Sequence, residues 1–196
     1  TIISSGGNNG GSLEFAAGIT TTGELYTWGS DSYGALGLND INVPRSVPTK
    51  VGSSSWTLIT CGLNHMAALS TNGTLWSWGY NGITNYTDSL GDGTTTPRSS
   101  PVQIGSSSWN FISAGNLESS GIINNKLYAW GLGTSGQLGD GTIVSKSSPI
   151  QIGTNSWTSV SVGGTHVAGI TSSYRLFTWG LGSTGQLGVV QVANQS

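Results

Sequence analysis

Two histidines and one cysteine are the residues of this chain whose chemistry could support catalysis or metal binding. His65 and His166 are its only histidines, and each lies 13 residues before a tryptophan. A nucleophile, a general base or a zinc ion would need several such groups in contact. Neither histidine has an acidic residue nearby in the sequence. Because the two histidines occupy the same position in different repeats, we expect them to lie far apart. We therefore predict no catalytic residue and no metal, and we expect each imidazole to bond the backbone within its own repeat.

The other reactive residue types also indicate structural roles. Cys61 is the single cysteine, so no disulfide can form within the chain, and we expect a buried, unreactive thiol. Asp92 and Asp140 share one phase in the phrase Leu-Gly-Asp-Gly-Thr, where an aspartate stabilises a turn through its own backbone. Bound calcium is the alternative there, although the loops offer few charges. The glycine-rich loops lack the lysine and the following helix of a phosphate-binding loop, so no cofactor is predicted.

The element that positions these residues is a short strand ending in Trp-Gly, which occurs four times. Its tryptophans are separated by 50, 52 and 49 residues, a period typical of propellers and other repeat folds. A glycine-rich loop ending in Leu-Gly follows each strand. We interpret the four tryptophans and the two histidines as structural residues of the repeat, because a phase-locked tryptophan is better explained by packing than by sugar stacking. These tryptophans are Trp28, Trp78, Trp130 and Trp179.

Each unit offers about four short strands bounded by glycine, proline, asparagine and serine, and no segment shows a helical period with caps. The sequence therefore predicts an all-β fold, a β-propeller of four-stranded antiparallel blades with about four repeats of roughly 50 residues. The expected repeats are 1–51, 52–104, 105–152 and 153–196, within a single domain over 1–196. Four units could be an excerpt of a longer chain, part of a ring that closes by oligomerisation, or a four-bladed ring.

Several phrases resemble the repeats of the regulator of chromosome condensation family, whose members form propellers, typically of seven blades. The likeness is carried by Ile59-Thr-Cys-Gly-Leu-Asn-His65, Gly73-Thr-Leu-Trp-Ser-Trp-Gly79 and Gly136-Gln-Leu-Gly-Asp-Gly-Thr142, and it is closest to bacterial and bacteriophage versions. The repeat's histidine is replaced by Phe15 in the first unit and by Leu117 in the third. The resemblance implies a propeller scaffold and two alternative functions, guanine-nucleotide exchange on a small GTPase and inhibition of an enzyme. No contact residues for either function match this chain.

Composition limits the classes of partner. Only 7% of the residues are charged, and the eight acids and six bases form no cluster. Nucleic-acid binding needs a basic stripe that neutralises phosphates, and membrane insertion needs about 20 consecutive apolar residues, so we expect neither. A surface rich in glycine, serine and threonine favours an extracellular or virion-associated location. The expected partner is a protein, a further copy of the chain bound through an open blade face, or a glycan.

Two segments depart from the repeat, and insertions on a rigid scaffold commonly carry binding. The second unit has four extra residues between its Trp-Gly and its Leu-Gly, and the first has about six extra residues at 6–13. Neutral drift of a tolerant loop is the alternative. We predict a non-enzymatic binding or structural propeller that presents such loops in a virion or at a cell surface. The candidate binding residues are Asn8, Asn9, Tyr80, Asn81, Tyr86 and Asp88.

Overall fold

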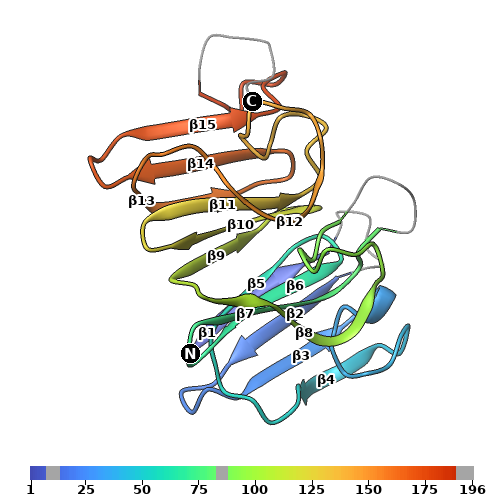
Figure 1. The fold of residues 1–196 in the computed structure, drawn as a ribbon. Helices are drawn as coiled ribbons and strands as arrows, with labels where there is room; N and C mark the ends of the chain where they lie inside the picture. The colour runs from blue at the N-terminus through green and yellow to red at the C-terminus, as the bar shows by residue number, and fades with distance from the viewer. Residues whose placement is uncertain (8–13, 83–87, 189–196) are drawn as a thin grey trace.

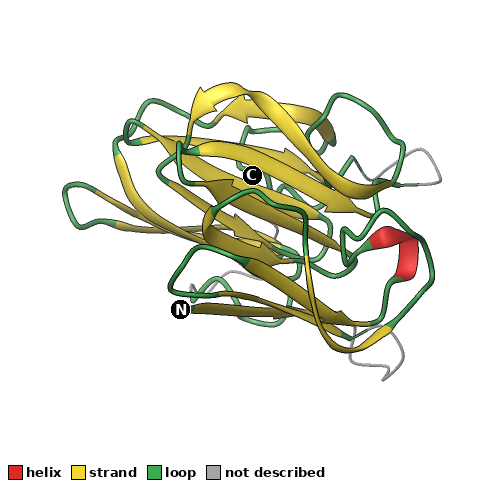
Figure 2. Cartoon of the chain, turned by 90° about the horizontal axis from the view of Figure 1, so that it is seen from below, coloured by secondary structure: helices red, strands yellow, loops and turns green. Residues whose placement is uncertain are grey.

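The computed structural model describes residues 1–7, 14–82 and 88–188, and within these ranges the chain is built almost entirely of β-strands. The strands form four antiparallel sheets, and in each sheet neighbouring strands are also neighbours in the sequence (Figure 1). The single helix in these ranges is the short 3-10 turn η1 (Ser32–Gly34), drawn red in Figure 2. No helix in the described part of the chain is long and apolar enough to cross a membrane. The predicted all-β propeller fold is confirmed.

Each sheet is one blade. Blade 1 contains β1 (Ile2–Gly6), β2 (Phe15–Ile19), β3 (Leu25–Gly29) and β4 (Arg45–Lys50). Blade 2 contains β5 (Trp56–Cys61), β6 (His65–Ser70), β7 (Thr74–Gly79) and β8 (Arg98–Ser108). Blade 3 contains β9 (Phe111–Ala114), β10 (Glu118–Ile123), β11 (Lys126–Gly131) and β12 (Lys146–Gln151). Blade 4 contains, within the described residues, β13 (Trp157–Val162), β14 (His166–Thr171) and β15 (Leu176–Gly180).

The blades stand in an open row. The first strand of each blade contacts the first strand of the next, so that β1, β5, β9 and β13 lie side by side. Blade 1 lies at the bottom of Figure 1 and blade 4 at the top, at opposite ends of the row. Because these two blades do not meet, the described residues form an arc rather than a closed four-bladed ring.

Each pair of neighbouring blades encloses a hydrophobic core built from the same positions of the repeat. Between blades 1 and 2, Ile19 and Leu25 pack with Trp56 and Trp78. The ring centroids of the paired tryptophans lie 6.1, 5.6 and 5.7 Å apart in the three cores, a spacing at which aromatic rings attract. The cores therefore lie between blades, and each blade depends on its neighbour. The corresponding sets are Leu69, Leu75, Trp109 and Trp130, and Ile122, Leu127, Trp157 and Trp179.

The register of blade 3 corrects one prediction, because Glu118 and not Leu117 replaces the histidine of the repeat. In every blade the second strand begins at the residue that pairs with the glycine of Trp-Gly, and in blade 3 that residue is Glu118. The β10–β11 turn is one residue shorter than the β6–β7 turn. Its central residues Asn124 and Asn125 have φ of 48° and 63°, as tight two-residue hairpin turns require. The 13-residue spacing of the other repeats, counted back from Trp130, therefore gives Leu117 instead of Glu118.

Candidate binding surfaces

His65 is buried between blades 2 and 3 rather than placed in a cleft. Its Nε2 lies 3.0 Å from Oγ of Ser119, at the start of β10 in the next blade. Burial lowers the pKa of His65 to about 4, so the ring is neutral near pH 7. The sequence predicted a backbone bond within one repeat. The structure instead shows a side-chain bond across two blades, since β10 lies beside the ring.

Glu118 and Cys61 are buried as well, and burial keeps both side chains protonated. Burial raises the pKa of Glu118 to about 8, although the N–H of Leu117 donates to its Oε2 at 3.1 Å. Burial also raises the pKa of the Cys61 thiol to about 12. A protonated thiol is a weak nucleophile. No three His, Cys, Asp or Glu side chains converge as a metal site in the described ranges.

The carboxylates of Asp92 and Asp140 close turns and pair with basic residues. Thr94 N–H donates to Oδ1 of Asp92 at 2.9 Å, and Arg98 Nε donates to Oδ2 at 2.8 Å. Asp140 repeats this arrangement with the backbone N–H of Thr142 at 2.9 Å and with Lys146 Nζ at 3.2 Å. These bonds occupy the oxygens that a calcium ion would need.

Three of the four strand-ending tryptophans are buried against the Leu-Gly loop of the preceding blade. Trp78 and Trp130 are 0% exposed and Trp179 is 8% exposed. Nε1 of Trp78 donates to the carbonyl of Ala35 at 3.0 Å, and Nε1 of Trp179 donates to the carbonyl of Gln137 at the same distance. The glycine of each loop leaves space for the ring. A Cβ would lie 2.6–2.8 Å from an indole atom at Gly37, Gly91 and Gly139.

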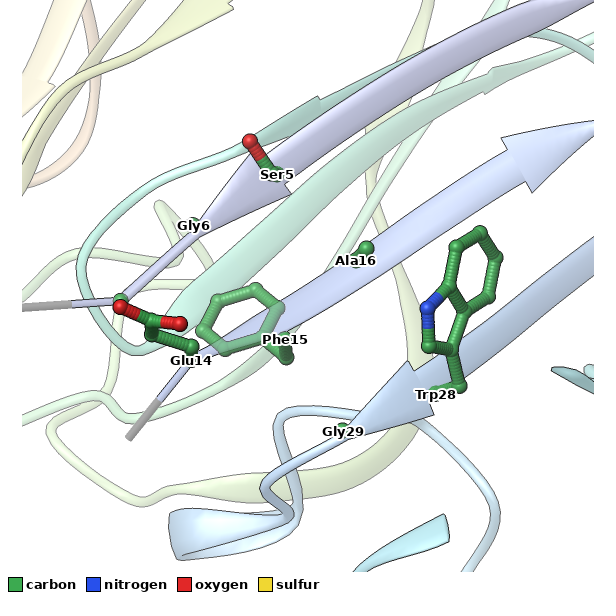
Figure 3. Close-up of a pocket in the computed structure, with 8 residues that line it drawn as sticks. Ser5, Gly6, Glu14, Phe15, Ala16, Trp28 and Gly29 are labelled. Carbon is green, nitrogen blue, oxygen red and sulfur yellow. The ribbon is translucent and has the colours of Figure 1, made fainter. Parts of the chain in front are cut away.

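Trp28 holds the same position in blade 1, but no described blade precedes it. Its indole is partly exposed, and its Nε1 makes no hydrogen bond within the described part of the chain. It lines a groove of about 520 Å³ on the outer side of blade 1 (Figure 3). The indole and the Glu14 carboxylate lie at opposite ends of this groove, with Ala16 and Phe15 between them. We call this surface the leading face; its lining residues are Ser5, Gly6, Gly7, Glu14, Phe15, Ala16, Trp28 and Gly29.

The other end of the row, on blade 4, exposes positions that are buried in the other blades. Ile170 is 40% exposed and Leu176 is 67% exposed, whereas their counterparts in blades 1 to 3 are at most 3% exposed. Gly188, the counterpart of Gly139, has no atom of the described residues within 4 Å of an added Cβ. The sequence indicated open blade faces but not these residues. We call this surface the trailing face and define it by the partly or fully exposed residues Ser161, Gly163, His166, Ile170, Leu176, Gln186 and Gly188.

The structure places the predicted binding residues of the two loops in different surroundings. Asn8, Asn9 and Tyr86 lie outside the described residues. Tyr80 packs against Tyr33 of blade 1, with ring centroids 4.8 Å apart. Asp88 is partly buried, and its pKa is raised by burial and by the nearby charge of Asp92.

Asn81 is fully buried and holds the loop of blade 2 in place. Its Oδ1 accepts from Leu90 N–H at 3.1 Å, and its Nδ2 donates to the Thr94 carbonyl at 2.8 Å. Asp31 does the same in blade 1, where its Oδ1 accepts from Leu36 N–H at 3.0 Å. Both residues lie three positions after the strand-ending tryptophan, a signal in the sequence for a scaffold role. Asn81 therefore has no free polar group to offer a partner.

Comparison with known sequences supports the assignment of the repeats. A family profile described as the regulator of chromosome condensation (RCC1) repeat matches residues 22–69 and 124–170. The ultraviolet-B receptor UVR8 of Arabidopsis thaliana is 32% identical over 131 residues, which are 63% of this chain and 29% of the receptor. The probable E3 ubiquitin-protein ligase HERC4 of Homo sapiens is 31% identical over 136 residues, which are 65% of this chain and 12% of the ligase. The chain thus spans less than a third of the length of these relatives.

Solved structures show the same fold at lower identity. Human WBSCR16 superposes with a TM-score of 0.83 at 22% identity, over 100% of this chain and 51% of that protein. Prp20p from Saccharomyces cerevisiae, whose structure was described with its binding to Gsp1p and histones, gives a TM-score of 0.79 at 18% identity, over 93% of this chain and 47% of that protein. The matched segments and the blade register together show that the chain contains repeats of the regulator of chromosome condensation (RCC1) type.

Proposed function

We propose that the chain is a non-enzymatic protein-binding scaffold and that the leading face binds a protein segment. The observation that carries this proposal is the exposure of Trp28, since the other three strand-ending tryptophans are at most 8% exposed. Trp78 and Trp179 each donate a hydrogen bond to the carbonyl of a loop that packs against the ring, and Nε1 of Trp130 is buried without such a bond. Trp28 presents its indole, whose N–H has no bond partner in the described structure, in a groove of about 520 Å³. A turn with a free carbonyl and a small residue beside it matches this surface.

The chemistry of the groove favours recognition over catalysis. Glu14 is the only titratable side chain among the described residues that line it, and Ala16 and the indole supply apolar surface, while Phe15 is 4% exposed. His65, Glu118 and Cys61 are buried elsewhere in neutral forms. An aromatic anchor at the edge of a concave surface with few charged groups is typical of protein interfaces.

Finer assignments stay predictions. Exchange activity on a small GTPase and enzyme inhibition are alternatives of the same protein-binding class, and a virion or cell-surface setting rests on composition. Glycan binding is a further prediction. Trp56 and Trp76 line a groove of about 400 Å³ between blades 1 and 2, but Trp56 is 3% exposed and offers little ring surface for stacking.

A photocrosslinker in the groove tests the proposal. Ala16→p-benzoylphenylalanine places the reactive ketone beside Trp28, and Val47→p-benzoylphenylalanine places it on the outer strand β4, where Val47 is 63% exposed. We expect irradiation in an extract of the native source to give a protein adduct at position 16 and not at position 47. After purification, the captured protein should bind the Trp28→Ala variant at least tenfold more weakly. The same adducts at both positions, or binding that ignores Trp28→Ala, would overturn the proposal.

A further inference from the structure

We infer that Glu118 is a proton-controlled switch between blades 3 and 4. The neutral carboxyl allows these two blades to pack, and loss of its proton loosens their interface while the other two interfaces stay closed. The binding function proposed above involves other residues, so the two proposals can fail separately. The position, the hydrogen bonds and the surroundings of the Glu118 side chain support the switch.

The Glu118 carboxyl lies at the boundary between the two blades. A Cβ added to Gly115, in the turn that precedes β10, would lie 3.1 Å from Glu118 Oε1. The same Cβ would lie 2.5 Å from Cγ1 of Val162 and 2.2 Å from the carbonyl oxygen of Gly163, two atoms of blade 4. The carboxyl therefore reaches the surface on which blade 4 packs, and His65 is placed in the same way between blades 2 and 3.

One oxygen of this carboxyl has no partner. Oε2 accepts from the Leu117 N–H at 3.1 Å, whereas Oε1 is buried and makes no hydrogen bond within the described residues. The ring of His65 meets the hydroxyl of Ser119 in the next blade. Val167 holds the position of Ser119 in blade 4, so no hydroxyl stands there for Glu118. A carboxylate at this place would lose its hydration without gaining a hydrogen bond, which costs far more than burial of the neutral acid.

No neighbouring charge compensates for this burial. β9 and β13 pack against β10 and contain no titratable side chain. Burial raises the pKa of Glu118 to about 8, and two backbone N–H groups, which lower it, are the only other contributions. The side chain is therefore largely neutral at pH 7 because of where it lies. The titratable groups on the other elements around it are His65 on β6, Lys126 and Tyr128 on β11, Lys146 on β12 with its partner Asp140, and His166 on β14.

The pH range of the switch follows from the two states of the interface. In the open state Glu118 meets water and ionises near its ordinary pKa of 4.5, whereas in the closed state it keeps its proton up to about pH 8. Between these values the closed state binds more protons, so a rise in pH favours the open state. We expect the equilibrium constant for opening to rise about a hundredfold from pH 6 to pH 9. His65 acts in the opposite direction, because its lowered pKa makes the interface between blades 2 and 3 sensitive to acid.

Amide hydrogen exchange of the purified chain tests the switch, with one reporter in each of two interfaces. The N–H of Val162 donates to Ser113 Oγ across blades 3 and 4 at 3.1 Å, and the N–H of Ala114 donates to Thr60 Oγ1 across blades 2 and 3 at 3.0 Å. After correction for the intrinsic effect of pH on exchange, the opening constant at Val162 should rise about a hundredfold from pH 6 to pH 9. The value at Ala114 should not rise. An equal rise at both amides would indicate global unfolding and would overturn the inference.

Glu118→Gln is the variant that isolates the proton. Its amide keeps the shape of the side chain and an acceptor for the Leu117 N–H, but it cannot ionise. The opening constant at Val162 should then be nearly the same at pH 6 and pH 9. Glu24→Gln is the matched control, because Glu24 pairs with Lys50 at the surface of blade 1 and its loss should leave the wild-type rise unchanged. A rise that persists in Glu118→Gln would contradict the switch.

A direct titration needs no substitution. The carbon-13 shift of the Glu118 carboxyl, followed by NMR from pH 5 to pH 10, should change with a midpoint at about 8. A midpoint below about 6, closer to the value of an ordinary glutamate, would mean that the closed interface accepts the charge. In that case the blades would pack around the ionised side chain, and the inference would be wrong.

Discussion

Trp28 and Trp78 occupy the same position in adjacent blades, yet they have different surroundings. Trp78 is 0% exposed and its Nε1 donates to the Ala35 carbonyl at 3.0 Å. Trp28 is partly exposed and lines an open groove. The difference lies in the neighbour and not in the residue, because only Trp78 has a Leu-Gly loop against its ring. The same contrast separates the three internal interfaces from the two outer faces throughout the molecule.

This contrast shows how a repeat protein can obtain a binding site without a special residue. In a row of blades each unit buries its surface on the next, and stability is close to a sum of such nearest-neighbour terms. Within the described structure, blades 1 and 4 each carry the same groups on a face that no described blade covers. We therefore propose that residues which hold the scaffold together at three interfaces can bind a partner on these two faces.

The tryptophan pair should show the largest effect. Trp78→Ala should lower the free energy of unfolding by about 4 kcal/mol, because it removes a buried indole and leaves a cavity. Trp28→Ala should cost about 1 kcal/mol, since the ring is partly exposed and makes no hydrogen bond within the described residues. Urea unfolding measures both values. Equal losses would contradict the difference between inner interfaces and outer faces.

The stability of the chain should depend on pH through His65. His65 has a pKa lowered to about 4, so the unfolded chain binds a proton first as the pH falls below about 6.5. Its contribution to stability is complete above that pH and is lost toward pH 4, by about 3 kcal/mol. The wild type should therefore lose about that much more than His65→Gln between pH 7 and pH 4, as measured by urea unfolding. An equal loss in the wild type and in His65→Gln would contradict the assignment to His65.

The loop glycines offer a matched pair with similar backbone strain. Gly139 and Gly188 have φ of 75° and 67°, so alanine should cost about 1–2 kcal/mol at either position. Gly139→Ala should cost about 2 kcal/mol more, because its Cβ would lie 2.6 Å from Nε1 of Trp179. Thermal unfolding of the two variants measures this difference. If Gly188→Ala destabilised the monomer as much as Gly139→Ala, the open space at Gly188 would be in doubt.

Loss of a hydroxyl that accepts a hydrogen bond from a backbone N–H of the next blade should give the smallest change in stability. Ser113→Ala removes the acceptor of the Val162 N–H and should cost about 1 kcal/mol. Ser161→Ala removes an exposed hydroxyl with no such donor and should change stability by less than about 0.5 kcal/mol. Chemical denaturation with replicate curves can resolve these values. Hydrogen exchange at the Val162 N–H should become faster in Ser113→Ala alone. A faster exchange in both variants would contradict the bond from Val162 N–H to Ser113 Oγ.

Much of the fold could be predicted from the sequence because its signals are local. The Trp-Gly period, the Leu-Gly loops and the Asn72–Gly73 turn each indicate a short-range structure, and they recur often enough to define a blade. Glu118 escaped this reasoning because a hairpin shorter by one residue changes the count but not the pairing. The pairing of β10 with β11 sets the register, and in it Glu118 lies opposite Gly131.

The candidate site was harder to predict because it depends on contacts between distant residues. Asn81 flanks an insertion and resembled a surface residue, yet it repeats the buried role of Asp31. Trp28 looked like one of four equivalent packing residues. Its exposure could not be inferred from its own strand, since burial is decided by a loop in another blade.

The sequence by itself determined the blade, since turn residues, strand alternation and a fixed period act over a few tens of residues. It also determined that the groups with potential chemistry share the phases of structural residues. The tertiary structure decided which copies of these repeated groups are enclosed and which are free. That decision needs the order of the blades in space, because a tryptophan is buried or open according to the surface that stands against it.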